Sequence, residues 1–192
     1  MINRLARITS ELFAPAVLVV ALLLAVGWHA GSQAGVSRWW GLPAALFAAG
    51  IPMAYVLRGV RRGRLTSHHI PEREHRRGPL LFGIASGGVG LALLLASGAP
   101  AEIVALLVAG LVGLVVFAVV TAFWKMSIHA GVAAGTVAVL VAVYGPWALP
   151  AVPLVPLVCW SRVLLTAHTT AQVVAGTVVG ALIAGLVFPA LR

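Results

Sequence analysis

The sequence predicts an all-helical protein that crosses a membrane several times, and three observations support this fold class. Hydrophobic residues make up 61% of the 192 residues and charged residues only 9%, with a mean hydropathy of +1.08. Soluble domains carry about 25% charged residues, so this chain cannot cover a water-facing surface. Its apolar stretches have the length of membrane helices and lack the strict alternation of barrel strands. We therefore expect a polytopic integral membrane helix bundle with six or seven transmembrane helices.

The apolar stretches divide the chain into seven predicted spans. They are expected at about residues 12–30, 40–57, 79–96, 101–123, 129–143, 149–165 and 168–188. Residues 1–11 form a polar lead that we expect on the membrane surface. Pro52 predicts a kink in the second span, and three prolines predict an irregular sixth span. The hydrophobic runs show no internal repeat, so residues 1–192 are expected to form one domain.

Three polar segments interrupt the apolar sequence. They are residues 58–78, 123–129 and 159–176. The first contains seven arginines, three histidines and two of the four glutamates. The second contains Lys125, which is the only lysine, and His129; the third contains Arg162, His168 and Gln172. Ionisable side chains at membrane depth are costly, so these segments are candidate functional sites.

The number of predicted spans between the polar segments places all three on one side of the membrane. Two spans separate each segment from the next, so the chain returns to the same face each time. Arg4 and Arg7 lie on that side, whereas the other side has only Arg38 and Arg192. The positive-inside rule then places the N-terminus and the site on the cytoplasmic side of the cell membrane.

The polar segments combine anion-binding donors with two separate histidines. Arginine forks and a lysine charge suit phosphate oxygens. Two histidines can divide the roles of nucleophile and proton donor. The net charge of +9 comes from a few basic spots at the membrane edge, so we expect no nucleic acid partner. The ensemble predicts phosphoryl transfer, in which positioning and charge stabilisation supply most of the catalysis.

The residue inventory gives no reason to expect a metal or a cofactor. The chain has no aspartate and only four glutamates, which leaves no carboxylate set for magnesium. The single Cys159 excludes a cysteine-based cluster. The histidines His68, His69 and His75 lie close in sequence but lack supporting carboxylates or cysteines, so no metal site is predicted there.

The third polar segment resembles a motif of the type 2 phosphatidic acid phosphatase superfamily, which includes the vanadium haloperoxidases. That motif is Ser-Arg, five residues, His, three residues and Asp. The chain has Ser161, Arg162, His168 and Gln172 at this spacing, with Gln in place of Asp. The resemblance covers about residues 64–180.

The other two polar segments extend the resemblance. The second motif of the superfamily is Pro-Ser-Gly-His, and residues 126–129, Met-Ser-Ile-His, match two of its four positions. The first motif is Lys, six residues and Arg-Pro. His69 and Arg76 match it loosely, with Pro79 three residues later. The three matches occur in the order of the superfamily motifs.

The resemblance implies a role for each matching residue. His168 corresponds to the nucleophile that forms a phosphohistidine, and His129 to the acid that protonates the leaving oxygen. The implied phosphate ligands are Arg73, Arg76, Lys125, Ser127 and Arg162. Lys125 adjoins the second motif and can replace the charge of the first-motif lysine. The carbonyl of Gln172 can accept the ring N–H of His168 and fix its tautomer, but it carries no charge.

These observations predict a metal-independent membrane phosphatase that acts on the phosphate or diphosphate head of a lipid, such as a prenyl phosphate or phosphatidic acid. One alternative is a transferase or cyclase that uses a prenyl diphosphate, which the uncharged Gln172 favours. The other is a non-enzymatic protein that binds or transports lipid phosphates. The expected partners are the lipid phosphate and membrane lipids. The glycines Gly176, Gly180 and Gly185 suit a homodimer as well as packing inside the bundle.

Overall fold

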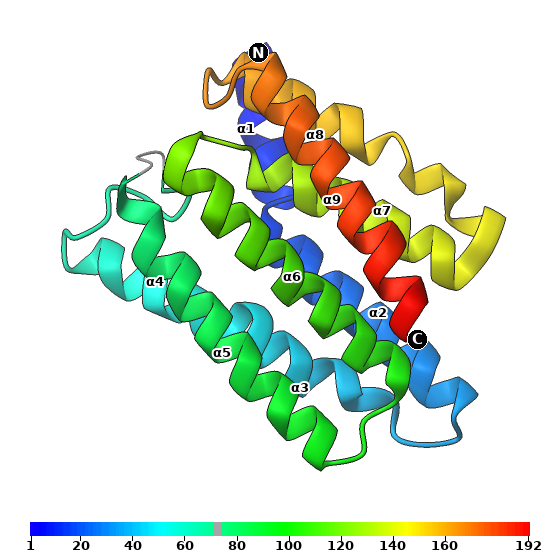
Figure 1. Ribbon diagram of the computed structural model, residues 1–192. Coiled ribbons are helices and arrows are strands. Elements are labelled where there is room, and N and C mark those ends of the chain that lie inside the picture. Colours follow the sequence, from blue (N-terminus) through cyan, green and yellow to red (C-terminus); the bar gives the residue numbers. More distant parts are fainter. Residues whose placement is uncertain (71–73) are drawn as a thin grey trace.

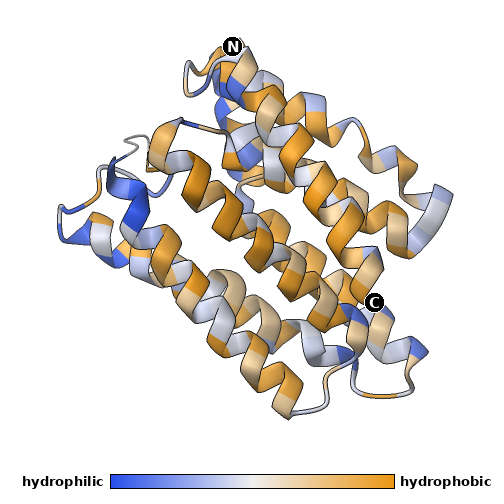
Figure 2. Cartoon of the chain, viewed as in Figure 1, coloured by the Kyte–Doolittle hydropathy of each residue, from blue (hydrophilic) through white to orange (hydrophobic). Residues whose placement is uncertain are grey.

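The computed structural model describes residues 1–70 and 74–192, and the regular structure within these ranges is helical. Six helical stretches are long and apolar enough to cross a membrane. They are Pro15–Gln33, Arg38–Arg61, Glu74–Ala96, Ala101–Phe123, Ile128–Ala151 and Thr170–Leu191. Figure 1 shows them side by side in one bundle, with the two termini at opposite ends. Hydrophobic residues cover the middle of the bundle and hydrophilic residues gather at its ends (Figure 2), as expected for a multi-pass membrane protein.

The α-helices are named in chain order. They are α1 (Ile2–Leu12), α2 (Pro15–Gln33), α3 (Gly41–Ala45), α4 (Ile51–Arg61), α5 (Arg77–Ala96), α6 (Ala101–Phe123), α7 (Ile128–Tyr144), α8 (Leu154–Leu164) and α9 (Thr170–Leu191). Short 3-10 helices cover Arg38–Trp40, Glu74–Arg76 and Gly145–Ala151.

The polar lead forms the amphipathic helix α1. Ala6 and Ser10 are buried on one side of it, where α1 packs against α8. Large apolar side chains, including Leu5 and Leu12, are exposed on the other side. Pro15 then occupies the first turn of α2, where a missing N–H costs little. This arrangement suits a helix at the membrane surface, and it brings the N-terminal residues to the end of the bundle that holds the site.

The predicted disturbance at Pro52 takes the form of a π-helical stretch, Leu46–Gly50, between α3 and α4. Pro52 has no N–H to donate to the preceding turn, so an ordinary α-helical ladder cannot run through this position. Local π geometry is one way in which a helix absorbs such a break. The second span therefore continues past the proline as α4.

The sixth predicted span, residues 149–165, is corrected by the structure. Prolines confine Gly145–Ala151 to a 3-10 helix, and α8 begins only after Pro153. With 11 residues, α8 is too short to count among the six candidate spans. The chain nevertheless runs back from the end of α7 toward the end where the N-terminus lies (Figure 1). The polar residues of α8 therefore still reach the same end of the bundle as the other polar segments.

The helix α9 is held against α7 by two glycines. A Cβ on Gly180 would lie 2.1 Å from the backbone oxygen of Gly131, and one on Gly176 would lie 2.4 Å from that of Ser127. No side chain fits at these distances, so the two helices approach as closely as their backbones allow. A Cβ on Gly185 would meet nothing within 4 Å. Two of the three glycines therefore serve packing within the chain, and a homodimer stays a prediction.

Candidate functional site

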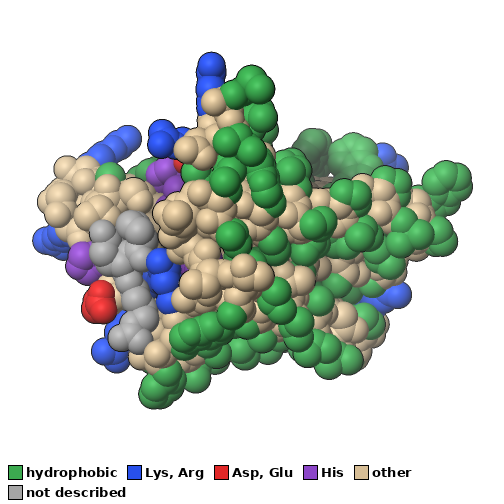
Figure 3. All heavy atoms as spheres, turned by 90° about the horizontal axis from the view of Figure 1, so that it is seen from above, with side chains coloured by type: hydrophobic (Ala, Val, Ile, Leu, Met, Phe, Trp, Pro, Cys, Tyr) green, Lys and Arg blue, Asp and Glu red, His purple; other side chains and the backbone are tan. Residues whose placement is uncertain are grey.

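A single pocket gathers residues from all three polar segments. Its volume is about 170 Å³. The polar side chains that line it are His68, His69, Arg76, His129, Arg162 and His168. Seen from above, the histidine side chains and most of the basic side chains gather toward one side of the molecule, and hydrophobic side chains cover much of the rest (Figure 3). The tertiary structure therefore brings together groups that are far apart in the sequence.

The turn between α8 and α9 explains how Arg162 and His168 come together. Thr166 adopts a left-handed backbone conformation, with φ of 53°, just after α8 ends. The backbone N–H groups of Ala167 and His168 then donate to the carbonyl oxygen of Arg162 at 3.1 and 3.2 Å. Such bonds close the end of a helix and reverse the chain. We call Arg162, His168 and Gln172 the α8–α9 corner.

The start of α9 fixes Gln172 by a capping box. The Thr169 hydroxyl accepts the N–H of Gln172 at 3.4 Å, and Gln172 Oε1 accepts the N–H of Thr169 at 3.2 Å. This reciprocal pair satisfies two backbone donors at the helix start. Gln suits this position in a capping box, so the residue that departs from the superfamily motif also has a local structural reason.

His168 donates its Nδ1–H to the same Gln172 oxygen, at 3.1 Å. This bond leaves the lone pair on Nε2, so that nitrogen is chemically able to act as a nucleophile. Burial lowers the pKa of His168 to about 4, and the charges of Arg162, Arg76 and Lys125 add to this, whereas the bond to Gln172 opposes it. The ring is therefore neutral at pH 7.

Two buried guanidinium groups line the pocket. Arg76 is 5% exposed and Arg162 is 6% exposed. Arg76 Nε donates to the carbonyl of Ile70 at 2.9 Å, and Arg162 Nη1 donates to the hydroxyl of Ser10. Within the described residues, Arg162 Nε has no hydrogen-bond partner. A buried donor without a partner is costly, so this arrangement favours an anion in the pocket.

His129 lies in the first turn of α7 and is buried beside the pocket. Its Nε2 also has no hydrogen-bond partner in the described part of the chain. Its ring centroid lies 5.2 Å from that of His69. A free imidazole nitrogen in this position can give or take a proton at a bound phosphate ester.

Ser127, which the resemblance predicts to bind phosphate, is buried and forms the N-cap of α7. Its hydroxyl accepts the N–H of Ala130 at 3.4 Å, and its own N–H donates to the backbone oxygen of Gln172 at 3.2 Å. It is not among the pocket-lining residues. Its contacts join the start of α7 to the start of α9, so they fix the positions of His129 and His168 relative to each other.

Lys125 and Arg73 are the two remaining predicted phosphate ligands. Lys125 is half-buried just before α7, and its charge acts on His168 without the side chain lining the pocket. Arg73 lies outside the described residues.

The structure adds two residues of α1 that the sequence did not indicate. Ser10 accepts the hydrogen bond from Arg162, and Glu11 accepts from His68 Nε2 at 3.1 Å and from His69 Nε2 at 2.8 Å. The expectation that these histidines lack a carboxylate partner is therefore wrong. Glu11 is 57 positions from His68 in the sequence, and no local pattern predicts their contact.

The contact affects the acidity of both partners. Burial acts to raise the pKa of Glu11, but the hydrogen bonds from His69 and His68 outweigh it, and the pKa lies below its usual value. Burial lowers the pKa of His69, and the bond to Glu11 opposes this. The carboxylate is therefore ionised at pH 7 and accepts a hydrogen bond from each ring.

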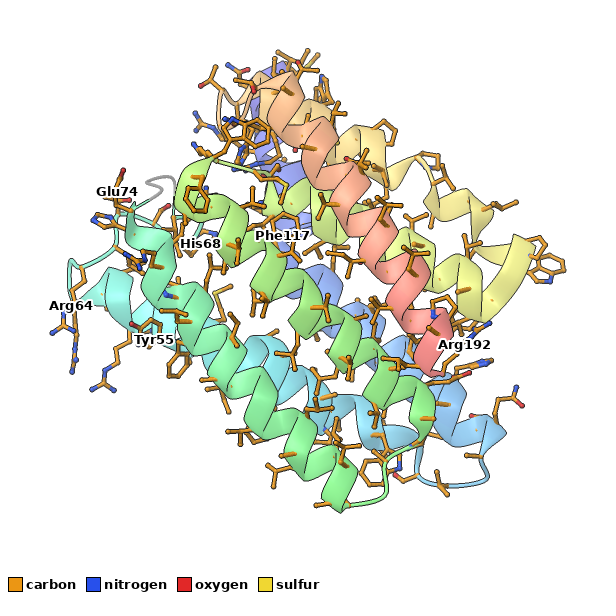
Figure 4. All side chains as sticks on the ribbon, in the orientation of Figure 1. Tyr55, Arg64, His68, Glu74, Phe117 and Arg192 are labelled. Carbon is orange, nitrogen blue, oxygen red and sulfur yellow. The ribbon has the colours of Figure 1, made fainter. Side chains whose placement is uncertain are left out.

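An apolar cavity of about 320 Å³ adjoins the polar pocket. Its walls include Leu22, Leu107 and Val139 from the middle of the bundle, and Phe117 (labelled in Figure 4). The two spaces share lining residues at Pro15, Ala16, Met53 and Ile128. A ligand with a charged head and an apolar tail can therefore occupy both.

Searches against protein-family models, curated proteins and solved structures found no match to this chain.

Proposed function

We propose that this protein is an integral membrane phosphatase that removes the phosphate or diphosphate head of a lipid. The observation that carries the proposal is the pocket of arginines and histidines that adjoins an apolar cavity. The buried guanidinium groups suit the head, and the cavity suits part of a prenyl or acyl tail. The motif resemblance to the type 2 phosphatidic acid phosphatase superfamily supports the same reaction class.

In the proposed mechanism, Arg76 and Arg162 bind the phosphate oxygens and offset the charge that develops on them. His168 Nε2 attacks phosphorus, and the bond to the lipid oxygen breaks. Because the bound phosphate is anionic, it favours a proton from water on His129 Nε2, and His129 gives that proton to the leaving oxygen. A lipid alcohol departs and a phosphohistidine is left on His168. His129 then takes a proton from water, and the resulting hydroxide attacks the phosphohistidine and releases phosphate. Arg76 and Arg162 supply the positive charge that magnesium provides in many phosphoryl transfers, so the proposed mechanism uses no magnesium.

Gln172 sets the tautomer of His168 in this mechanism. When Nε2 bonds to phosphorus, the ring becomes cationic, and the Nδ1–H still donates to the Gln172 carbonyl. The amide offers a dipole where an aspartate would offer a full charge. The attack is therefore expected to be slower than with a carboxylate partner. The uncharged amide is also the feature that favours the alternative reaction, transfer or cyclisation of a prenyl diphosphate.

We further propose that the pocket faces the cytoplasm from the cell membrane. Arg4 and Arg7 belong to α1, and Arg64 (labelled in Figure 4) lies at the same end of the bundle as the pocket residue His68. Arg192 lies at the other end, where its Nη1 donates to the carbonyl of Ala142 at 2.6 Å. The excess of arginine at the pocket end is typical of a cytoplasmic face.

The test is phosphate release by purified protein from prenyl phosphates, prenyl diphosphates and phosphatidic acid, without added magnesium. His168→Ala should abolish release from the best substrate. Arg64→Ala is the matched control, because this exposed arginine points away from the bundle (Figure 4). Full activity in His168→Ala contradicts the proposal.

Product analysis separates the remaining functions. A phosphatase yields phosphate and an alcohol, whereas a transferase or cyclase yields a prenylated or cyclised product. If no lipid in the panel is turned over, but lipid phosphate binds and Arg162→Ala weakens the binding while His168→Ala does not, the protein is a binding or transport protein and the phosphatase is excluded.

A further inference from the structure

A second cluster, made of Glu11, His68 and His69, lies at the rim of the pocket and has no part in the proposed mechanism. We call it the α1 cluster. Glu11 comes from the end of α1, and the two histidines come from the loop between α4 and α5. Each residue offers one ligand atom, and these atoms all lie within 4.8 Å of one another.

The spacing of these atoms fits a small divalent cation. Zinc binds imidazole nitrogens and carboxylate oxygens at about 2.0–2.2 Å in a tetrahedral arrangement, so neighbouring ligand atoms lie about 3.4 Å apart. The two oxygens of Glu11 already lie 3.1 Å from His68 Nε2 and 2.8 Å from His69 Nε2. Only small movements of these side chains are needed for one oxygen and two nitrogens to surround an ion.

We propose that Glu11, His68 and His69 form a divalent metal site for which zinc is the best match. Two histidines and one glutamate are a ligand set found in zinc enzymes, with the fourth position left open. Imidazole ligands favour zinc over magnesium or calcium, which prefer oxygen. The site does not depend on the proposed phosphatase activity.

A cation can bind at the cluster although two positively charged arginines line the same pocket, because the cluster lies at the rim. Arg76 and Arg162 lie in the depth of the pocket and are 5% and 6% exposed. At the rim, the side chain of His68 is 39% exposed and that of Glu11 is 55% exposed. Solvent screens charges at the rim more strongly than charges in the depth. The Glu11 carboxylate also offsets part of the positive charge.

A metal at this place would join two elements that are distant in the sequence. It would tie the end of α1, whose Ser10 contacts Arg162, to the loop that carries His68 and His69. The open fourth position would take water or an anionic oxygen. The metal would thus hold the rim of the pocket in one arrangement.

The test is calorimetric titration of the full-length protein with zinc alone. The protein is in detergent, is purified without a polyhistidine tag, and is free of lipid substrate. We expect one saturable site in the wild-type protein. His69→Ala and Glu11→Gln should weaken zinc binding at least tenfold, since a change of about this size follows even the loss of a residue that only supports a ligand.

Two matched variants complete the design. His75→Ala removes another histidine of the same polar segment, which is not part of the cluster, and should bind zinc as the wild type does. His168→Ala should also bind zinc normally, so failure of the phosphatase proposal and failure of the metal site give different results. Absence of a saturable zinc site in the wild type, or wild-type affinity in His69→Ala with its thermal unfolding unchanged, overturns the inference.

Discussion

The α8–α9 corner and the α1 cluster both hold histidines by hydrogen bonds, but they do so in opposite ways. At the corner, buried His168 donates to an uncharged amide, Gln172 Oε1, at 3.1 Å. In the cluster, half-buried His69 donates to a carboxylate, Glu11 Oε1, at 2.8 Å. The corner spans eleven consecutive positions and is closed by backbone bonds, whereas the cluster joins residues 58 positions apart.

The difference shows how the surroundings of a histidine can suit it to two different functions. Burial beside two guanidinium groups, with an amide partner, keeps His168 neutral and leaves Nε2 free for attack. Exposure at the rim, with a carboxylate between two rings, gives the α1 cluster a set of donors that suits a cation. The corner is therefore expected to control the rate of reaction, and the cluster to control the arrangement of the rim.

In the comparison of the corner with the cluster, the largest expected effect is the loss of activity in Arg162→Ala. Removal of a donor that stabilises developing charge costs about 10²–10³ in rate. Glu11→Gln, on the cluster side, should lower kcat/KM less than about tenfold, because Glu11 does not contact the reacting atoms in the proposed mechanism. Both variants are compared by phosphate release from the same lipid.

Two further measurements serve as controls for this comparison. Ser10→Ala removes the hydroxyl that Arg162 contacts and shows whether that contact, rather than the guanidinium itself, carries the effect. Thermal unfolding of each variant shows whether a loss of activity is caused by a loss of folding stability. An equal loss of activity in Glu11→Gln and Arg162→Ala would show that the cluster belongs to the catalytic machinery.

The second prediction concerns the pH dependence of His168. Its pKa of about 4 means that Nε2 stays unprotonated, and reactive, until the pH approaches 4. The rate of acylation of His168 by diethyl pyrocarbonate, followed by mass spectrometry, should therefore fall near pH 4. Loss of reactivity already near pH 6.5, the ordinary value for histidine, would contradict the environment described for the corner.

The same pKa also predicts a change in stability with pH. An unfolded chain binds a proton at His168 below pH 6.5, and the folded chain binds it only near pH 4. The unfolded state therefore holds more protons in this window, and the free energy of unfolding decreases as the pH falls from 6.5 to 4. His168→Gln should remove this part of the pH dependence in thermal unfolding measurements.

The third prediction uses the glycines that hold α9, and with it the corner, against α7. Gly180→Ala forces a methyl group against the backbone of Gly131 and should lower the free energy of unfolding by about 1–3 kcal/mol. Gly185→Ala is the matched control, since a Cβ there meets nothing within 4 Å. We expect activity to fall in Gly180→Ala while zinc affinity stays unchanged. A similar loss of stability in both variants would show that the close approach of α9 to α7 does not cause the loss in Gly180→Ala.

The corner could be predicted from the sequence because its geometry is local. The apolar stretches predict that one span ends near residue 165 and the next begins near residue 168, which places Arg162, His168 and Gln172 around the junction. The span at Ala101–Phe123 was likewise predicted within its observed bounds, since a proline before it and a break in hydropathy after it define its ends. Such features depend on neighbours along the chain.

The contacts of α1 could not be predicted in this way. Glu11 meets His68 and His69 only because α1 packs on α8 and the loop between α4 and α5 lies beside it. Ser127 has a structural role that the motif match did not indicate, because its hydroxyl caps the start of α7. Prolines indicated an irregular sixth span, but the position at which α8 begins depends on tertiary packing.

The smallest expected effect is a gain of activity in Gln172→Glu. Glutamate suits the capping box as glutamine does, and it keeps an oxygen in reach of His168 Nδ1. The added charge stabilises the cationic ring that forms during attack, so we expect kcat to rise severalfold, up to about tenfold. The charge also raises the pKa of His168, so the loss of diethyl pyrocarbonate reactivity should move to higher pH.

Gln172→Ala is the matched control for this gain, because it removes both hydrogen bonds of the amide oxygen and adds no charge. It should lower the free energy of unfolding by about 1 kcal/mol through the lost cap, and it should lower kcat. If Gln172→Glu raises the pKa of His168 without raising kcat, charge on the ring does not limit the reaction. His168 would then work best with an uncharged amide partner. The difference between the uncharged partner at the corner and the charged partner in the cluster would then matter for function.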